Sequence, residues 1–227
     1  MTVQQPLAIV AGAGAGLGQS LISRLKAGGM NAVGLGRRQP AETEGAFHTV
    51  DLSDVAATDA LISDLIATHG APRIVVHNTA ELMIAPFAET ALADYQRTWT
   101  SMVQTLVVLA QSTVQPMVDA GGGALIVSGA TASLRGGARF SAFASAKFAL
   151  RGLTQSLARE YQPMGLHVAH VILDGIIDSE RSRTRHTLDP AKMMMPEDIA
   201  EMYWQIAHQP PSTWSHEVDL RPASEGF

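Results

Sequence analysis

The stretch Leu7 to Gly18, LAIVAGAGAGLG, constrains the fold of this 227-residue chain more than any other. Its first half is a short apolar run, its second half alternates glycine with small residues, and Leu17, Leu21 and Leu25 recur at helical spacing. This order predicts a buried strand, a tight turn and a helix. Glycine lets the turn approach a ligand closely, and the free amides at the helix start attract an anion such as a diphosphate. Such a turn also suits close packing alone, so both interpretations stay open here.

The spacing of the glycines separates two kinds of turn. The general dinucleotide pattern GxGxxG fails, because Leu17 or Gln19 stands where its last glycine should be. The pattern GxxxGxG fits instead. With that spacing the stretch resembles the short-chain dehydrogenase/reductase family, whose usual form begins with Thr where this chain has Ala11. The resemblance implies a nicotinamide dinucleotide in contact with Gly12, Gly14, Gly16, Leu17 and Gly18.

Length and composition are consistent with such a fold. The 227 residues suit one α/β domain with a full hydrophobic core, and 46% of them are hydrophobic against 16% charged, which excludes a disordered chain. The net charge of -5 offers no basic surface for nucleic acid, and no apolar run approaches the ~20 residues that cross a membrane. The absence of cysteine excludes disulfides, thiolate metal sites and cysteine nucleophiles, and no metal site is predicted. The composition is typical of a cytoplasmic protein.

Two arginines follow the second predicted strand, Asn31 to Gly36. In dinucleotide folds this point faces the adenosine ribose, where an acidic side chain accepts the 2′-hydroxyl of NAD and arginine pairs with the 2′-phosphate of NADP. Arg37 and Arg38 are present and no acid is, which favours NADP(H) over NAD(H) as the cofactor. The alternative is that both are solvated loop charges.

The third predicted strand, Ala46 to Leu52, ends in an acidic and an apolar residue. Asp51 and Leu52 resemble the pair that the family places beside the adenine ring. Asp51 is equally suited to cap the next predicted helix, Val55 to His69, for which Ser53 and Asp54 are rival caps.

The fourth predicted strand, Arg73 to Ala80, ends in HNTA, which resembles the family's NNAG. Asn78 keeps the asparagine that braces the sheet end near the cofactor, whereas His77 and Ala80 depart from the pattern. We interpret His77 as a satisfied buried imidazole rather than as a catalyst.

The stretch Gly129 to Ala149 decides what chemistry is available. The resemblance implies a serine that polarises the substrate oxygen and, thirteen residues on, a YxxxK motif whose tyrosine transfers the proton. Lys147 matches the lysine, which contacts the nicotinamide ribose in the family, although a surface lysine is the alternative. Phe143 stands at the usual Tyr position and Ala130 at the usual Ser position, with Thr131 one residue on.

A third member of the usual proton relay is also missing. The family carries a relay asparagine on a long helix, predicted here over Tyr95 to Val118, and Met102 stands at its position. The sixth predicted strand, His167 to Gly175, ends in Asp-Gly where the family has Pro-Gly beside the nicotinamide carboxamide. Asp174 is therefore a candidate for acid/base work and Gly175 for cofactor contact. A loop carboxylate that caps the backbone is the alternative for Asp174.

The remaining segments complete a single domain over residues 1–227. Residues 179–196 are expected to form a substrate lid, whose Arg181, Arg183 and Arg185 either hold an anionic substrate or are solvated. A helix, Pro196 to Ala207, and a last strand, His216 to Arg221, follow. The resemblance implies a doubly wound Rossmann fold with a seven-stranded parallel sheet and helices on both faces. It also implies a homodimer or homotetramer formed through Tyr95 to Val118 and Ser145 to Tyr161.

Two functions are consistent with these residues. The first is an NADP(H)-dependent oxidoreductase acting on a small carbonyl or related substrate, in which Thr131, Asp174 or a bound water replaces the usual proton relay. The second is a catalytically silent NADP(H)-binding sensor or structural protein with a degenerate active site. Chemistry other than hydride transfer on a sugar or acyl substrate stays open as a third.

Overall fold

A seven-stranded parallel sheet forms the centre of the molecule in the computed structural model, which describes residues 5–41 and 45–224. Its strands are β1 Leu7–Ala11, β2 Asn31–Gly36, β3 Ala46–Thr49, β4 Ile74–His77, β5 Gly123–Ser128, β6 Leu166–Leu173 and β7 Glu217–Leu220. They are ordered β3-β2-β1-β4-β5-β6-β7. The central strands are continuous apolar runs because a parallel sheet is covered on both faces, and every residue of β1 and β6 is buried. The predicted Rossmann fold is confirmed.

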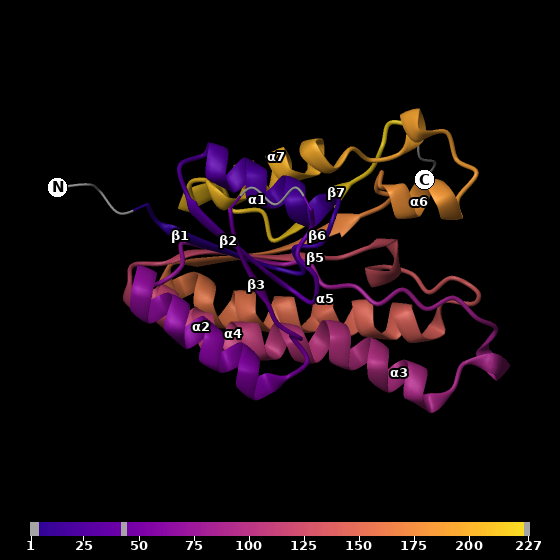
Figure 1. The fold of residues 1–227 in the computed structure, drawn as a ribbon, viewed down its shortest axis with the longest axis horizontal. Coiled ribbons are helices and arrows are strands. Elements are labelled where there is room, and N and C mark those ends of the chain that lie inside the picture. Colours follow the sequence, from indigo (N-terminus) through magenta and orange to yellow (C-terminus); the bar gives the residue numbers. More distant parts are fainter. Residues whose placement is uncertain (1–4, 42–44, 225–227) are drawn as a thin grey trace.

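Helices cover the two faces of the sheet in separate layers (Figure 1). On one face lie α1 (Leu17–Ala27) and α7 (Pro196–Ala207), which pack against each other. On the other face lie α2 (Val55–His69), α4 (Thr105–Asp119) and α5 (Ser141–Tyr161). Each layer encloses its own hydrophobic core, and β1 contributes alternate side chains to the two cores.

The long helix predicted over Tyr95 to Val118 differs from the structure in its start and in its regularity. The helical run begins at Leu92 with α3 (Leu92–Trp99), continues through a π-helical turn, Thr100–Gln104, and becomes α4. The apolar periodicity did not predict the start of the helix at Leu92. The side chain of Leu92 is 73% exposed, so it does not belong to the buried apolar face from which the helix was predicted. In addition, α5 begins at Ser141, four residues before the predicted start.

Residues 179–196, expected as an irregular loop, contain regular structure. Ser179 caps α6 (Glu180–Arg185) by accepting a hydrogen bond from the Ser182 amide, and a 3₁₀ turn, Pro190–Lys192, follows. Ile177 pairs with Met194 in an isolated bridge, which ties both ends of the segment together. The role of this segment as a substrate lid stays a prediction.

All seven strands point their carboxyl ends toward the same edge, at the end of the molecule where α3 and α6 lie (Figure 1). In open α/β sheets this edge is where ligands bind, at the point where the strand order reverses. Here the order reverses between β1 and β4. Among the described residues, no helix combines the length and apolarity needed to span a membrane.

Candidate functional site

The glycine turn between β1 and α1 is shaped by close backbone approaches. A Cβ atom at Gly12, whose φ is +88°, would lie 2.6 Å from the carbonyl oxygen of Asn78, and one at Gly18 would lie 2.7 Å from the oxygen of Gly12. Gly16 has a φ of +85°, a conformation that side chains oppose. A Cβ atom at Gly14 would meet nothing within 4 Å, so the turn leaves open space on its outer side. These features fit a diphosphate that approaches the backbone and the start of α1.

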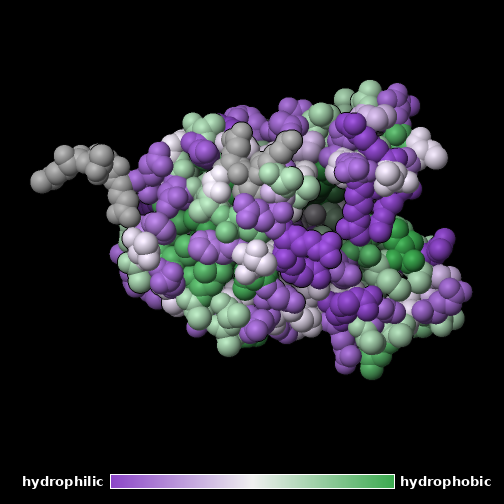
Figure 2. All heavy atoms as spheres, in the orientation of Figure 1, coloured by the Kyte–Doolittle hydropathy of each residue, from purple (hydrophilic) through white to green (hydrophobic). Residues whose placement is uncertain are grey.

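A cleft of about 1200 Å³ runs over this turn and along the carboxyl edge of the sheet. Figure 2 shows hydrophilic side chains gathered around a hollow toward that end of the molecule. Most of the predicted cofactor-binding residues line the cleft, namely Gly12, Gly14, Gly16, Leu17, Gly18, Arg37, Arg38, Asp51, Leu52 and Asn78. The sequence analysis did not single out the hydroxyl-bearing residues Thr79, Ser101, Thr105 and Ser179, which also line it.

The lining of the cleft includes the two predicted arginines. Arg37 and Arg38 are exposed directly after β2. The Asp51 carboxylate accepts hydrogen bonds from the amide of Ser53 at 3.0 Å and from its hydroxyl at 2.7 Å. These bonds hold the pKa of Asp51 below its usual value. Of the rival caps, Asp54 is the one that caps α2, by accepting a hydrogen bond from the Ala57 amide. Asp51 lines the cleft instead.

A chain of buried hydrogen bonds supports the floor of the cleft. The Asn78 side-chain amide donates to the carbonyl of Gly12 at 3.2 Å. Its oxygen accepts from the Ser128 hydroxyl at 2.9 Å, and Ser128 lies 2.8 Å from the hydroxyl of Tyr203 on α7. Asn78 therefore links the glycine turn to the end of β5 through hydrogen bonds, and its role near a cofactor stays a prediction.

His77 lies directly beneath the cleft floor. Its Nε2 atom lies 2.9 Å from the hydroxyl oxygens of both Thr79 and Thr105, which line the cleft. Its Nδ1 atom is buried without a partner, so the imidazole is only half satisfied. Burial, reinforced by Lys147 and then His170, lowers the pKa of His77 to about 3. The ring is therefore neutral at physiological pH. His77 is buried, as we interpreted it, but the interpretation that it is fully satisfied is wrong, because Nδ1 has no partner.

Lys147 is held inside the protein rather than at the cleft surface. Its side chain is buried on α5, its Nζ donates to the carbonyl oxygen of Ser128 at 2.9 Å, and burial lowers its pKa to about 8. The Phe143 ring centroid lies 5.7 Å from this Nζ, and the ring packs against the hydrophobic core on that face of the sheet. Met102 is fully buried in the π-helical turn. The contact of Lys147 with a ribose stays a prediction.

Thr131 and Asp174, the two predicted substitutes for the relay, are in direct contact. The Thr131 hydroxyl donates to Oδ1 of Asp174, although the two residues follow different strands, β5 and β6. The buried Asp174 also pairs through Oδ2 with the Arg221 guanidinium at 3.1 Å. The sequence analysis missed Arg221, because only strand pairing brings the residue after β7 beside the end of β6.

Gly175 and Arg183, predicted to contact cofactor and substrate respectively, have other neighbours in the structure. Gly175 does not line the cleft, and a Cβ atom there would lie 2.8 Å from Pro222 and 3.1 Å from Met194, so close packing accounts for this glycine. Of the three lid arginines, Arg181 lines the cleft. Arg183 is committed to an ion pair with the buried carboxylate of Asp178, which lowers the pKa of that carboxyl.

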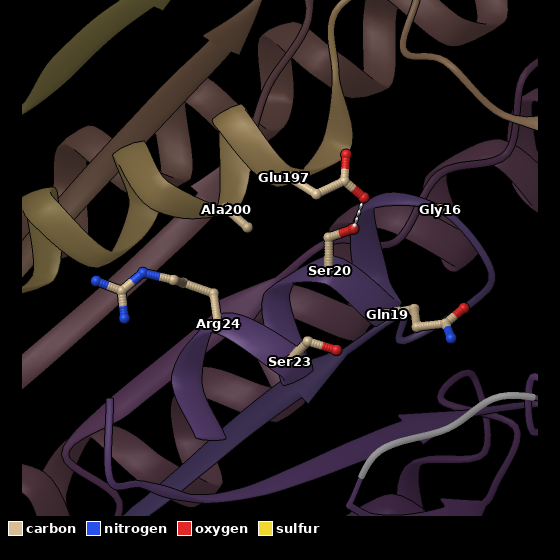
Figure 3. Close-up of a pocket in the computed structure, with 7 residues that line it drawn as sticks. All are labelled: Gly16, Gln19, Ser20, Ser23, Arg24, Glu197 and Ala200. Carbon is tan, nitrogen blue, oxygen red and sulfur yellow. Dashed lines mark hydrogen bonds between the residues drawn. The ribbon is translucent and has the colours of Figure 1, made fainter. Parts of the chain in front are cut away.

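A second, smaller cavity of about 560 Å³ lies between α1 and α7 (Figure 3). Ser20 donates a hydrogen bond across it to Glu197 at 3.0 Å, and Arg24 pairs with Glu201. Arg24 also lies 4.3 Å from the ring centroid of Trp204. Because these side chains pair with one another, we attribute the cavity to the packing of the two helices.

The fold, the glycine turn and the cleft together define a dinucleotide-binding α/β protein. A family model described as short chain dehydrogenase matches residues 6–188. The chain belongs to the short-chain dehydrogenase family, a family of oxidoreductases that bind a nicotinamide dinucleotide on a Rossmann fold.

Three similar proteins place this result in context. L-xylulose reductase of Mesocricetus auratus is 29% identical over 198 residues, which make up 83% of this chain and 79% of that protein. The crystal structure of a short-chain dehydrogenase from Rhodopseudomonas palustris has a TM-score of 0.83 at 30% identity and covers 96% of this chain and 98% of its own. A metagenomic short-chain oxidoreductase in complex with NADP has a TM-score of 0.82 at 23% identity, over 97% of this chain and 98% of that one.

Proposed function

We propose that this protein is an NADP(H)-dependent oxidoreductase that moves hydride between the nicotinamide ring and a small carbonyl or hydroxyl substrate. The observation that carries the proposal is the cleft of about 1200 Å³ over a glycine turn in which Gly12 and Gly18 have no room for a side chain. Its adenosine end presents Arg37 and Arg38. Two similar proteins support it: one relative is described as L-xylulose reductase, and the metagenomic oxidoreductase of the same fold was crystallised in complex with NADP.

We assign tasks to residues of the cleft lining and to Lys147, Thr131 and Asp174, which are not among the lining residues. The amides at the start of α1 bind the diphosphate, the two arginines bind the 2′-phosphate, and Asp51 with Leu52 borders the adenine. Lys147 exchanges its bond with the Ser128 carbonyl for the nicotinamide ribose. Thr131 and Asp174 hold the substrate oxygen and move its proton. Bound NADP(H) supplies or accepts the hydride.

A silent nucleotide-binding protein is the second candidate, and a specific observation favours it. Phe143 fills the tyrosine position with a partly buried ring that packs against the core and has no proton to donate. Turnover of NADPH with a panel of carbonyl compounds, or of NADP⁺ with alcohols, supports the oxidoreductase. Tight NADPH binding without turnover on either panel supports the silent protein. Calorimetry that detects no binding of NADPH or NADH to folded protein contradicts both.

The double variant Arg37→Ala/Arg38→Ala is expected to weaken NADPH binding about 10–100-fold and to leave NADH binding nearly unchanged. Charge-assisted bonds to a phosphate contribute more than neutral ones, and only NADPH has a phosphate at this position. Isothermal titration with both nucleotides measures the change. Lys26→Ala, at the far end of α1, is the control for loss of a positive charge. Equal weakening of both nucleotides would show that the arginines do not read the phosphate.

We also propose that the protein forms a homodimer or homotetramer through the outer face of α3, α4 and α5. Leu92 and Trp99 on α3 and Phe148 on α5 leave 73%, 47% and 43% of their surfaces exposed, which is costly for large apolar side chains unless a partner covers them. A second copy of the chain supplies a matching apolar face.

Light scattering after size-exclusion chromatography is expected to give the mass of a dimer or tetramer for the wild-type protein and that of a smaller species for Phe148→Glu. A buried charge at such an interface opposes association. Met164→Glu, at another exposed apolar side chain, is the control and keeps the wild-type mass. A monomeric wild-type protein at micromolar concentration would overturn the proposed assembly.

A further inference from the structure

The short helix α6 is held in place by one of its own arginines. The guanidinium of Arg183 donates to Oδ1 of Asp178 at 2.6 Å and to Oδ2 at 2.5 Å. The Asp178 side chain is only 6% exposed, so this ion pair ends on a buried carboxylate. The backbone of Asp178 is held as well, because its amide donates to the carbonyl of Met194 at 2.9 Å. The helix is therefore fixed relative to the segment that leads into it.

This segment lies beside the glycine turn of the cleft. A Cβ atom at Gly16 would lie 3.6 Å from the Cβ atom of Ser179, the residue that caps α6, and 4.0 Å from the carbonyl oxygen of Asp178. Gly16 directly precedes α1, where free backbone amides attract a diphosphate. Gly16 and Ser179 both line the cleft. The start of α6 is thus a neighbour of the expected diphosphate position.

Arg181 brings a positive charge from α6 to this cleft. It lies in the first turn of the helix and belongs to the cleft lining, whereas Arg185 at the end of the same helix does not. None of the ion pairs among the described residues involves Arg181. A guanidinium without an acidic partner in a cleft is available to an anionic ligand, and its planar donors match phosphate oxygens.

The charges of the whole cleft lining favour a ligand with several anionic groups. The lining contains four arginines and two acids, namely Arg37, Arg38, Arg97, Arg181, Asp51 and Glu81. Arg97 is paired with Asp94 at 2.7 Å and with Glu81 at 3.6 Å, so it is occupied. NADP(H) carries a 2′-phosphate and a diphosphate, and the proposed function uses Arg37 and Arg38 for the 2′-phosphate alone. The charge of Arg181 then matches the diphosphate.

We propose that Arg181 binds the diphosphate of NADP(H), together with the backbone amides at the start of α1. The inference rests on the proposed function, because it assumes a dinucleotide in the cleft. It gives Arg181 a task at the cofactor, in place of the anionic substrate or the solvent that the sequence suggested. Arg183 is a positioning residue, since its ion pair with Asp178 holds the helix that carries Arg181.

Isothermal titration with two fragments of the cofactor separates its phosphate groups. ADP-ribose carries the diphosphate without the 2′-phosphate, and 2′-AMP carries the 2′-phosphate without the diphosphate. Arg181→Ala is expected to weaken binding of NADPH and ADP-ribose about tenfold and to leave 2′-AMP within about twofold of wild type, because a charge-assisted bond to the diphosphate is lost. Arg37→Ala/Arg38→Ala is expected to give the reverse result with the two fragments.

Arg185→Ala is the matched control, because it removes the same charge from the same helix outside the cleft lining. It is expected to keep the wild-type affinity for all three ligands. Arg181→Lys keeps the charge without the planar donors and is expected to lose less affinity for ADP-ribose than Arg181→Ala loses.

Three results would overturn the inference: an unchanged affinity for NADPH in Arg181→Ala, an equal loss for ADP-ribose and 2′-AMP in that variant, or an equal loss for ADP-ribose in Arg185→Ala. A wild-type protein that binds none of the three ligands would instead count against the proposed function, so the two failures are distinguishable.

Discussion

Lowering the pH from 7 to 5 is expected to reduce the free energy of unfolding by about 4 kcal/mol, through two histidines that stay neutral in the folded protein. His77 on β4 and His170 on β6 are fully buried. Burial is the main cause that lowers the pKa of His77 to about 3 and that of His170 to about 4, and the nearby Lys147 ammonium adds to both shifts. A loss of this size is a large fraction of the roughly 5–15 kcal/mol that is typical of a domain.

The direction of the effect follows from where each state binds protons. Below pH ~6.5 an unfolded histidine is protonated, whereas these two stay neutral in the folded chain until the pH nears 4 and 3. The unfolded state therefore gains about 1.4 kcal/mol per pH unit for each histidine in that interval. Their contribution to stability is complete above pH ~6.5 and decreases steadily as the pH falls.

The charged groups around the histidines add a second range of pH, below about 4.5, in which stability is lost. Near His170, Arg151 and His216 also lower its pKa, and Glu217 alone raises it. The Arg151 guanidinium holds the pKa of Glu217 at about 2. The stability from this carboxylate is present above its ordinary pKa near 4.5 and is lost as the pH falls toward 2. The loss between pH 6.5 and 5 therefore reports the histidines.

Urea unfolding at pH 5, 6, 7 and 8 measures the prediction. His77→Asn is expected to remove about 2 kcal/mol of the change between pH 7 and 5. His170, and the buried His167 whose pKa burial also lowers, still contribute. The variant also starts less stable, because Thr79 and Thr105 lose the ring as a partner. His208→Asn, at an exposed histidine on the surface, is the matched control for the loss of an imidazole. If His77→Asn kept the full wild-type dependence on pH, the buried imidazole would not be the source of the acid sensitivity.

The sequence predicted the fold well because its strongest signals are local. Apolar runs identify parallel strands that are buried on both faces, and α2 and α7 have the predicted bounds. The π-helical turn before α4 was not predictable in this way. It coincides with bonds from the Thr105 hydroxyl to the carbonyls of Ser101 and Met102, and Thr105 in turn contacts His77 on β4. The residue periodicity of a helix cannot predict a contact between its Thr105 and His77 on another element.

The residues of the candidate site also fall into two groups, those that local motifs predicted and those that only the tertiary structure identified. Residues of the glycine turn and the strand ends were predictable because motif spacing determines their positions, and most of them line one cleft. Arg221 and the hydroxyls of Thr79 and Thr105 were not, because their importance depends on which strands are neighbours. Asp174 was selected from its position alone, and only the structure supplies the two partners that fix its role in our proposal.

Phe143→Tyr combined with Ala130→Ser is expected to raise NADPH-dependent reduction of carbonyl compounds at least about 10²-fold over the wild-type protein. A positioned proton donor contributes about 10²–10⁴ to the rate of such a reaction. The tyrosine ring would lie where the Phe143 centroid is 5.7 Å from the Nζ of Lys147. An ammonium at that distance favours the phenolate and so lowers the pKa of the new hydroxyl.

The second substitution, Ala130→Ser, adds a hydroxyl beside Thr131. The Thr131 hydroxyl itself already donates its proton to Asp174. Ala130 adjoins Thr131 directly, and a serine there adds a hydroxyl whose proton is not committed to Asp174. Initial rates with cyclohexanone, benzaldehyde and diacetyl measure the gain, and NADPH titration verifies that each variant binds the nucleotide. Phe87→Tyr adds the same hydroxyl at an exposed position before α3 and is expected to leave the rates unchanged. A double variant that binds NADPH but reduces no probe faster than Phe87→Tyr would show that the two missing hydroxyls are not what separates this chain from its catalytic relatives.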